Sequence, residues 1–183
     1  DSEYWAVYVQ DEFPITDVLS LHAGVRFDYF ETFGGAVSPR TALIYTPFQK
    51  TTFKFVYGRA FREPNNFELY YEDDSSQVAN PNLDPETIDT YEIIYEQYLG
   101  KYLRGTIVGF YNSINDFISF TKEEDIGKFD NVDGVHAKGF EFELEGKHEC
   151  GFEGRVSYTI QEAKGGGPGD ALANSPRHLA NLN

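Results

Sequence analysis

The residues best suited to bind a ligand lie in one polar segment between two stretches rich in aromatic residues. They combine aromatic rings, amides, carboxylates and one guanidinium: Arg62, Asn65, Asn66, Glu68, Tyr70, Tyr71, Glu72, Asp73 and Asp74. Aromatic faces and carboxylates can together hold a large organic ligand or a cationic one. The acidic run from Glu72 to Asp74 is also compatible with a weak calcium site or with a solvated loop. We predict ligand binding by this segment and assign no metal site to the chain.

Residue patterns that would indicate catalysis are missing from the sequence. It contains no G-x-S-x-G, H-E-x-x-H or phosphate-loop pattern, and the glycine-rich run 165–169 lacks a following Lys-Ser/Thr pair. Any two of Glu141, Glu143 and Glu145 could be taken for the two catalytic carboxylates of a glycosidase. Residues two apart, however, simply share one face of a strand. Structural roles are favoured over metal ligation for the four histidines, which are His22, His136, His148 and His178. We therefore predict neither an enzyme nor a bound cofactor.

Composition and charge narrow the class of protein. The 183 residues include 16 Phe, 13 Tyr and 17 Gly but no Met, a mixture that favours strands over long helices and predicts an all-β chain. The net charge of −15 disfavours nucleic acid as a partner, because phosphate binding needs clustered Lys and Arg. The single Cys150 excludes an internal disulfide. No apolar run of about 18 residues is present, so no transmembrane helix is predicted.

Alternation of apolar and polar residues predicts about nine strands. Phe53, Phe55 and Tyr57, for example, share one side of a strand while the residues between them share the other. The predicted strands cover residues 4–12, 18–30, 38–47, 52–62, 87–98, 102–120, 134–148, 152–164 and the chain from 175 onward. Ten residues tilted by about 45° span roughly 23 Å, close to the apolar band of an outer-membrane barrel. Soluble sandwich strands are typically only about five or six residues long.

Short and long connections alternate between these strands. The short connections are 13–17, 48–51, 99–101 and 149–151, and the long ones are 31–37, the insert between Arg62 and Thr87, 121–133 and 165–174. All long connections therefore fall at one end of an up-and-down antiparallel sheet. Outer-membrane barrels show this asymmetry, so the fold class predicted is part of an antiparallel transmembrane β-barrel.

The two faces of the predicted strands suit lipid on one side and water on the other. Phe140 and Phe142 alternate with the row formed by Glu141, Glu143 and Glu145. Such a row is costly in a dry core but tolerable in a wet lumen where Lys and Arg of neighbouring strands approach. Tyrosines near strand ends are predicted to form an interfacial girdle, and they are Tyr29, Tyr57, Tyr91 and Tyr98.

Short recognisable motifs are spread over nearly the whole chain. They are Q-D-E-F at 10–13, A-G-V-R-F-D at 23–28, S-P-R at 38–40, Y-G-R-A-F-R-E-P at 57–64, E-L-Y at 68–70, N-P-N-L-D-P-E at 80–86, Y-E at 91–92, G-F-E-F-E at 139–143 and N-S-P-R-H at 174–178. In this order and spacing they resemble TonB-dependent outer-membrane receptors, including those for siderophores, cobalamin and colicin I. The positions that carry the resemblance are Pro39, Arg40, Gly58, Phe61, Arg62, Pro64, Asn80, Pro81, Leu83, Pro85, Glu86, Glu92, Gly139, Glu141, Asn174, Pro176 and Arg177. Residues 1–183 are similar to the C-terminal part of a barrel of about 22 strands, without the plug domain or the final strands.

The resemblance implies capture of a scarce large nutrient, such as a ferric siderophore, haem or cobalamin, at the Gram-negative outer membrane. It also implies import driven by the TonB-ExbB-ExbD complex through the plug, and contact with outer-membrane lipid and lipopolysaccharide. The haem receptors of this family are matched only in part, since Glu63 replaces a small residue and no His lies between Arg62 and Asn80. A passive porin-like barrel and a soluble β-sandwich binding module remain as alternatives.

Overall fold

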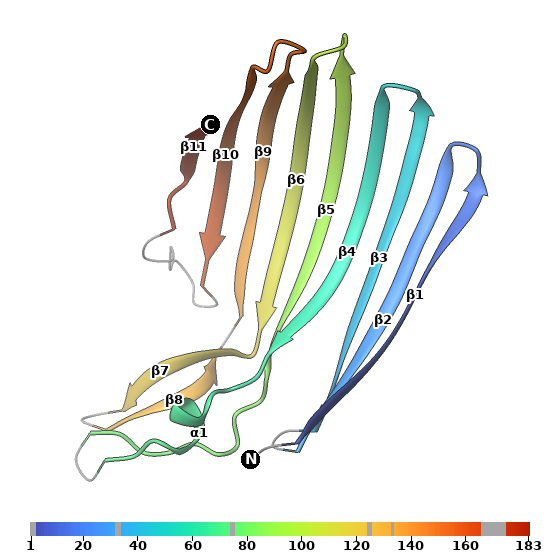
Figure 1. The fold of residues 1–183 in the computed structure, drawn as a ribbon. Helices are drawn as coiled ribbons and strands as arrows, with labels where there is room; N and C mark the ends of the chain where they lie inside the picture. The colour runs from blue at the N-terminus through green and yellow to red at the C-terminus, as the bar shows by residue number, and fades with distance from the viewer. Residues whose placement is uncertain (1–2, 32–33, 74–75, 124–125, 133, 166–174) are drawn as a thin grey trace.

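The computed structural model describes residues 3–31, 34–73, 76–123, 126–132, 134–165 and 175–183, and its dominant feature is one long antiparallel sheet. Within these residues a 9-stranded sheet has the order β1-β2-β3-β4-β5-β6-β9-β10-β11, and β7 pairs with β8 in a separate hairpin (Figure 1). The elements are β1 (Tyr4–Thr16), β2 (Leu19–Phe30), β3 (Gly34–Phe48), β4 (Thr51–Arg62), α1 (Asn66–Tyr70), β5 (Glu86–Leu99), β6 (Leu103–Asn115), β7 (Phe117–Glu123), β8 (Ile126–Val132), β9 (Val135–Lys147), β10 (Glu153–Lys164) and β11 (His178–Leu182). The predicted all-β antiparallel class is confirmed.

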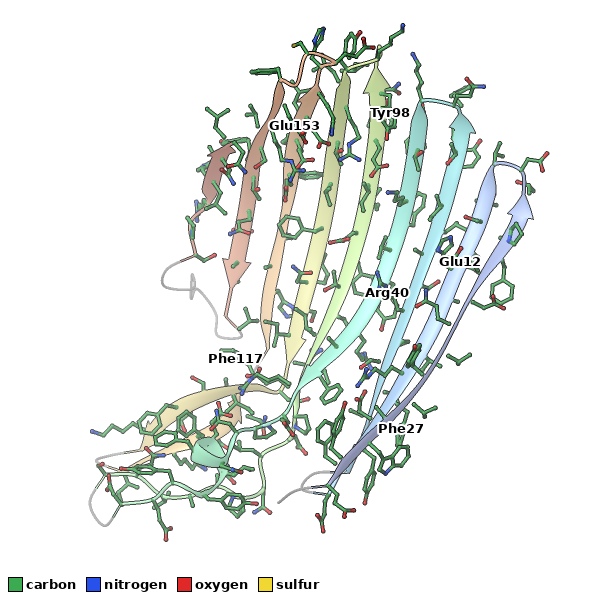
Figure 2. The ribbon with its side chains drawn as sticks, viewed as in Figure 1. Glu12, Phe27, Arg40, Tyr98, Phe117 and Glu153 are labelled. Atoms are coloured by element: carbon green, nitrogen blue, oxygen red, sulfur yellow. The ribbon has the colours of Figure 1, made fainter. Side chains whose placement is uncertain are left out.

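One face of the sheet is apolar and exposed, and we call it the outer face. Cross-strand pairs place Phe55 beside Ile93 and Ile107 beside Phe142, so the apolar residues of successive strands form continuous rows. Phe140 is 58% exposed on this face although it is a large hydrophobic residue. Figure 2 shows side chains standing on both sides of the ribbon along the sheet. The outer face is therefore suited to contact with an apolar medium such as lipid rather than with water.

The opposite face is polar and more shielded, and we call it the inner face. Basic side chains from neighbouring strands do reach the glutamate row of β9, as predicted from the sequence. Arg104 Nη2 lies 2.6 Å from Glu145 Oε2, and Arg155 lies within 3.6 Å of Glu143. Lys54 and Glu96 make a further pair at 2.8 Å. These ion pairs thus lie on the face that a barrel turns towards its lumen.

The large sheet has no second layer packed against it in the part of the chain that is described. Among the described residues the buried hydrophobic ones are Leu69, Leu83, Ile118 and Val135, and the first three form a small cluster outside the large sheet. No described helix is long and apolar enough to cross a membrane. A sandwich would interlock the aromatic face with another sheet. The soluble β-sandwich alternative therefore finds no support in this fold.

The predicted long connection 31–37 is wrong, because β3 already begins at Gly34. Phe30 pairs with Gly34, and Tyr29 pairs with Gly35, so both glycines belong to the ladder. A Cβ at Gly35 would lie 2.8 Å from the Phe27 ring, which explains the glycine by ring packing rather than by a loop. The predicted alternation of short and long connections fails at this one turn.

The predicted strand 102–120 and the predicted polar loop 121–133 are also wrong. The long strand ends at Asn115, and Asp116 has a φ of 53°, a left-handed conformation that Asp tolerates better than most residues. The chain then forms the hairpin β7–β8, in which Phe120 lies opposite Phe129. The polar composition of 121–133 predicted a loop, but residues 121–123 and 126–132 belong to paired strands.

The tyrosines predicted to form a girdle do not all lie on one face of the sheet. Tyr57, Tyr91 and Tyr111 are direct neighbours across β4, β5 and β6 on the outer face, and the first two rings are 5.0 Å apart. Tyr98, by contrast, lies opposite Arg104 on the inner face, so its assignment to a girdle is wrong. The row of three tyrosines marks the level at which the outer face changes from apolar to charged.

Candidate ligand-binding loop module

The insert between β4 and β5 and the hairpin β7–β8 pack together at one rim of the sheet, and we call their described residues the loop module (63–73, 76–85, 116–123 and 126–132). Figure 1 places α1, β7 and β8 at this rim, while the turns after β3, β5 and β9 lie at the opposite rim. Leu69, Leu83 and Ile118 form the small core of the module, and Phe129 packs against it. The module is therefore a folded unit rather than a solvated loop.

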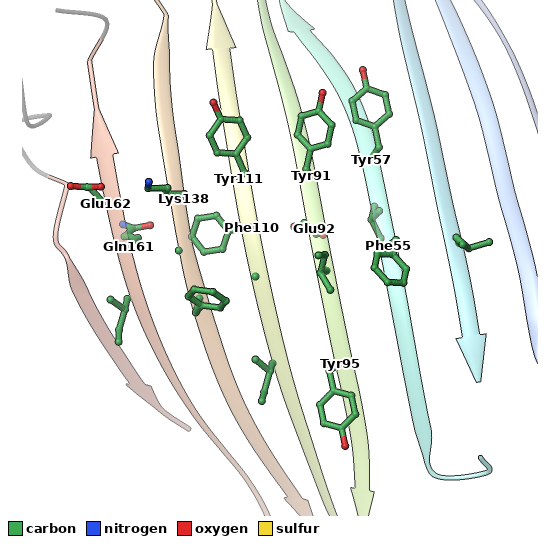
Figure 3. Close-up of a pocket in the computed structure, with 18 of the residues that line it drawn as sticks. Phe55, Tyr57, Tyr91, Glu92, Tyr95, Phe110, Tyr111, Lys138, Gln161 and Glu162 are labelled. Carbon is green, nitrogen blue, oxygen red and sulfur yellow. The ribbon is translucent and has the colours of Figure 1, made fainter. Parts of the chain in front are cut away.

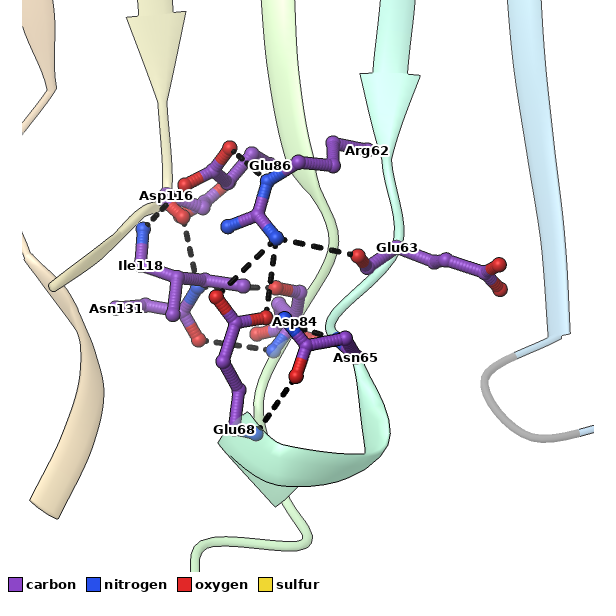
Figure 4. Close-up of polar contacts among 9 residues, drawn as sticks. All are labelled: Arg62, Glu63, Asn65, Glu68, Asp84, Glu86, Asp116, Ile118 and Asn131. Carbon is purple, nitrogen blue, oxygen red and sulfur yellow. Dashed lines mark hydrogen bonds and ion pairs between the residues drawn. The ribbon is translucent and has the colours of Figure 1, made fainter.

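Arg62 joins the sheet to the loop module. Its Nε donates to Glu86 Oε2 at 2.7 Å, and its Nη1 donates to Glu68 Oε2 at 3.0 Å (Figure 4). The other carboxylate oxygen of Glu86 accepts the backbone N–H of Ile118 at 2.7 Å. One guanidinium thus connects the end of β4, the start of β5, α1 and, through Glu86, β7. Its role in this structure is to hold the module together.

Glu86 is a buried carboxylate that is kept charged. Burial alone would raise its pKa, but the hydrogen bonds from Arg62 and from the Ile118 backbone outweigh burial, so the pKa of Glu86 is below its ordinary value. Glu86 lies five residues beyond the tyrosine row, on the loop side of the strand. Its ionised form therefore stabilises the module and not the membrane-facing part of the sheet.

Lowering the pH is expected to loosen the loop module. Because the folded pKa of Glu86 is lowered, its charge contributes stability above the unfolded pKa of about 4.3, and this contribution is lost as the pH falls through the folded value. Hydrogen exchange of the amides in 117–123, corrected for the intrinsic pH dependence of exchange, should show more frequent opening in acid. Glu86→Gln should abolish most of that pH dependence. An unchanged pH profile in this variant would contradict the assignment.

The short helix α1 is stabilised by its own capping residues. Asn65 Oδ1 accepts the backbone N–H of Glu68 at 3.0 Å, and Glu68 Oε2 accepts the backbone N–H of Asn65 at 2.8 Å. This reciprocal capping box satisfies donors that a five-residue helix cannot satisfy internally. Two of the predicted ligand contacts, Asn65 and Glu68, are thus occupied by bonds within the module.

Asn131, on the hairpin strand β8, hydrogen-bonds to the insert and to the start of the hairpin. Its Nδ2 donates to the carbonyls of Asp84 at 2.9 Å and Asp116 at 2.7 Å, and its Oδ1 accepts the N–H of Asp84 at 2.8 Å. Asn80 Nδ2 donates to the carbonyl of Phe129 at 2.9 Å. Sequence reasoning missed Asn131 and Phe129 because it treated 121–133 as a loop. The available signal was the period-two spacing of Ile118 and Phe120, which continues the apolar alternation beyond Asp116.

Aromatic rings at the surface of the module remain available to a ligand. Phe67 and Tyr71 stack with ring centroids 4.5 Å apart, and Phe129 connects Phe67 at 5.9 Å with Phe120 at 5.3 Å. Phe67 is 52% exposed, and Tyr71 and Phe120 are also exposed. We call Phe67, Tyr71 and Phe120 the aromatic surface. Tyr70 is exposed on the same helix.

The remaining predicted ligand contacts divide into exposed residues and turn-forming residues. Asn66 and Glu72 are exposed. Asp73 closes a turn, since its carboxylate accepts from Ser76 Oγ at 2.7 Å and from the N–H of Gln77 at 3.2 Å. Asp74 lies outside the described residues. In the described ranges no group of three His, Cys, Asp or Glu side chains is placed to hold a metal ion.

The motif positions are distributed over the sheet and the module. Those in strands are Pro39, Arg40, Gly58, Phe61, Glu92, Gly139 and Glu141, and those in or next to the module are Arg62, Pro64, Asn80, Pro81, Leu83, Pro85 and Glu86. Pro176 and Arg177 precede β11, and Asn174 lies outside the described residues. A Cβ at Gly139 would collide with the carbonyl oxygen of Ile160, so this position requires glycine.

Comparison with known proteins gives the same architecture over the whole chain. The profile of the family described as TonB dependent receptor-like, beta-barrel matches residues 1–183. The vitamin B12 transporter BtuB of Vibrio cholerae serotype O1 is 33% identical over 127 residues, which are 68% of this chain and 20% of that protein. The iron-regulated outer membrane virulence protein of the same species is 28% identical over 122 residues, which are 63% of this chain and 18% of that protein.

Two solved structures have a similar fold. A point mutant of the ferric enterobactin receptor PfeA from Pseudomonas aeruginosa superposes with a TM-score of 0.84 at 21% identity, covering 99% of this chain and 30% of that one. The siderophore receptor PirA from Acinetobacter baumannii superposes with a TM-score of 0.82 at 18% identity, covering 99% of this chain and 31% of that one. The chain spans about a fifth of the length of the curated relatives it matches.

Proposed function

Because the chain belongs to the TonB-dependent receptor family and forms part of its β-barrel, we propose that it serves in nutrient capture at the outer membrane of a Gram-negative bacterium. The nutrient class is a large metal-bearing organic ligand, a ferric siderophore or a cobalamin. The names of the relatives support this class, since they include a vitamin B12 transporter and siderophore receptors. Binding and transport, not catalysis, are the activities of these relatives.

The observation that carries the proposal is the aromatic surface of a prefolded loop module. Phe67 and Tyr71 are held on a capped helix, and Phe120 is held on a hairpin, so little ordering is needed when a ligand binds. Rigid aromatic side chains supply large contact areas at low entropic cost. The module lies at the rim where the long connections gather, which is the extracellular side of an outer-membrane barrel.

Import requires more than the residues described. We propose that the polar inner face lines the lumen, and that a plug in the complete receptor connects it to the TonB-ExbB-ExbD complex. Energy from that complex would release the ligand inward. The chain itself contributes part of the barrel and part of the rim at which the ligand is first bound.

Removing the aromatic surface is expected to weaken ligand capture. Phe67→Ala combined with Tyr71→Ala in the membrane-inserted receptor should raise the Kd for the cognate ferric siderophore or cobalamin by about tenfold or more, because stacked aromatic anchors dominate such contacts. Binding is measured by quenching of intrinsic fluorescence, and uptake is measured in a strain that lacks its own receptor. Phe48→Ala is the matched control, because Phe48 is an exposed aromatic residue at the opposite rim. Equal Kd values for the double variant and the control would overturn the role of the aromatic surface, and a receptor that binds no siderophore or cobalamin would overturn the proposed function.

A further inference from the structure

The large sheet splits between β3 and β4 at the rim that carries the loop module. The last cross-strand pair of these two strands is Arg40 opposite Gly58, although β3 begins at Gly34 and β4 continues to Arg62. Figure 1 shows the end of β4 curving away from β3 towards α1 and β7. We call the seam the place where residues 34–39 of β3 and 59–62 of β4 run on without pairing with each other.

Both sides of the seam keep their pairing with the strand behind them. β3 stays paired with β2 to its first residue, and β4 stays paired with β5 to its last residue. Beside the seam, Tyr57 and Tyr91 lie next to each other on β4 and β5 (Figure 3). Farther along, Arg59 Nη2 lies 2.8 Å from Asp89 Oδ2, an ion pair that also joins β4 to β5. The seam thus separates two intact parts of one sheet.

The seam leaves backbone groups without a partner in the ladder. The N–H of Thr46 donates to β2, so even-numbered residues of β3 face β2 and odd-numbered ones, such as Val37, face β4. The carbonyl of Lys50 accepts from β5, so odd-numbered residues of β4, such as Arg59, face β3. Among the described residues, the N–H groups of Val37 and Arg59 have no backbone acceptor. Two strand edges that could pair therefore face the same seam.

Pro39 lies where the pairing of β3 with β4 stops. It is the first β4-facing residue beyond the paired region, and proline has no N–H to donate. Continuing the register of the paired region would place Pro39 opposite Arg59 and Ser38 opposite Ala60. The ladder can therefore be extended across the seam, but its first added pair would form one hydrogen bond instead of two.

A ring contact crosses the seam in its open form. Phe30 of β2 and Phe61 of β4 have ring centroids 5.8 Å apart, in an edge-to-face arrangement. In the extended register Phe61 would lie on the outer face with Phe55, whereas Phe30 lies on the inner face, so this contact would be lost. A ring contact and a few backbone hydrogen bonds contribute free energies of similar size. The open and the closed seam therefore lie close in free energy.

We propose that the seam is a two-state element that closes when residues 59–62 of β4 join the ladder of β3. Arg62 ties the end of β4 to Glu86 and to Glu68 of α1, so the loop module moves together with β4 towards β1–β3. Closing the seam therefore sets where the aromatic surface stands at the rim. That last consequence rests on the proposed function, whereas the seam itself rests on the backbone pairing alone.

Disulfide trapping in the membrane-inserted receptor tests the proposal. Ser38→Cys combined with Ala60→Cys places two thiols at a non-hydrogen-bonded pair of the closed register, where Cα atoms are about 4.5 Å apart and a disulfide fits. Every variant also carries Cys150→Ser, because the native thiol is exposed. Ala42→Cys combined with Val56→Cys is the matched control, because these residues are already opposite each other in the paired region. With the same added oxidant, the seam pair should close completely, at a rate within about tenfold of the control pair. A control pair that closes while the seam pair stays reduced would overturn the proposal.

Restoring the missing donor gives a second measurement. Pro39→Ala adds one backbone hydrogen bond to the closed form, so it should speed disulfide formation at the seam pair by about three- to tenfold. Pro47→Ala, on the same strand at the opposite rim, should leave that rate unchanged. An equal rate in the two proline variants would overturn the role of Pro39. Nutrient binding is measured in parallel, and a receptor that closes the seam but binds no siderophore or cobalamin would overturn the proposed function while supporting the seam.

Discussion

Replacing Ile93 by Arg is expected to destabilise the membrane-inserted receptor by about 1–3 kcal/mol, between the cost of about 2–4 kcal/mol for cationic residues at the lipid-facing midplane of a barrel and that of about 0–1 kcal/mol near its interfaces. Ile93 is 57% exposed on the outer face, two residues from the tyrosine row and towards the middle of the strand. The guanidinium would have to leave water for hydrocarbon, and no carboxylate of the outer face is its cross-strand neighbour, since Phe55 and Gly109 occupy those positions.

Ile94→Arg is the matched control for this prediction. Ile94 is the next residue of the same strand, but its side chain lies on the inner face, between Glu92 and Glu96 along the strand and opposite Lys54 across it. In a wet lumen this arginine stays hydrated, and attraction to the two carboxylates offsets repulsion by Lys54, so we expect a change below about 1 kcal/mol. Reversible unfolding from lipid vesicles in guanidinium chloride measures both. If the two variants are destabilised equally, the assignment of the outer face to lipid is wrong.

Removing the Arg62 guanidinium is expected to open the loop module. Arg62→Met leaves Glu86 buried and charged without its main partner, which costs about 3–5 kcal/mol for a fully buried pair. Because Arg62 itself is 44% exposed, we expect a smaller cost of about 2–3 kcal/mol. Amides of 117–123 should exchange faster, and ligand affinity should fall because the aromatic surface is no longer held in place.

Two further variants test the physical cause of that effect. Arg155→Met removes another arginine that pairs with glutamates, but this pair is exposed and its distances are 3.5–3.6 Å, so its loss should cost less than about 1 kcal/mol. Adding Glu86→Gln to Arg62→Met removes the unpaired charge while the amide oxygen still accepts from Ile118. This combination should recover most of the lost stability. A failure to recover would mean that Arg62 acts by packing and not by charge.

Period-two alternation along the chain was sufficient to predict an antiparallel sheet with one apolar face and one polar face. The reason is that neighbouring side chains of any strand point to opposite faces, so the pattern is readable without knowing which strands pair. Phe140 and Glu141 reached opposite faces as predicted, and Arg104 and Arg155 approached the glutamate row. Motif order predicted the family for the same reason, since motifs are local stretches of sequence.

The tertiary structure alone decided how the loop residues are used. We predicted Arg62, Asn65 and Glu68 as ligand contacts because they are polar residues in a long insert. The structure adds that the folded module uses them for internal ion pairs and caps. The decisive partners are distant in sequence: Glu86 meets the backbone of Ile118, and Asn131 meets Asp84. Local patterns carry no information about such contacts, because they exist only after the hairpin β7–β8 has packed against the insert. The physical reason is that a buried polar group must be satisfied by whichever group the fold brings to it.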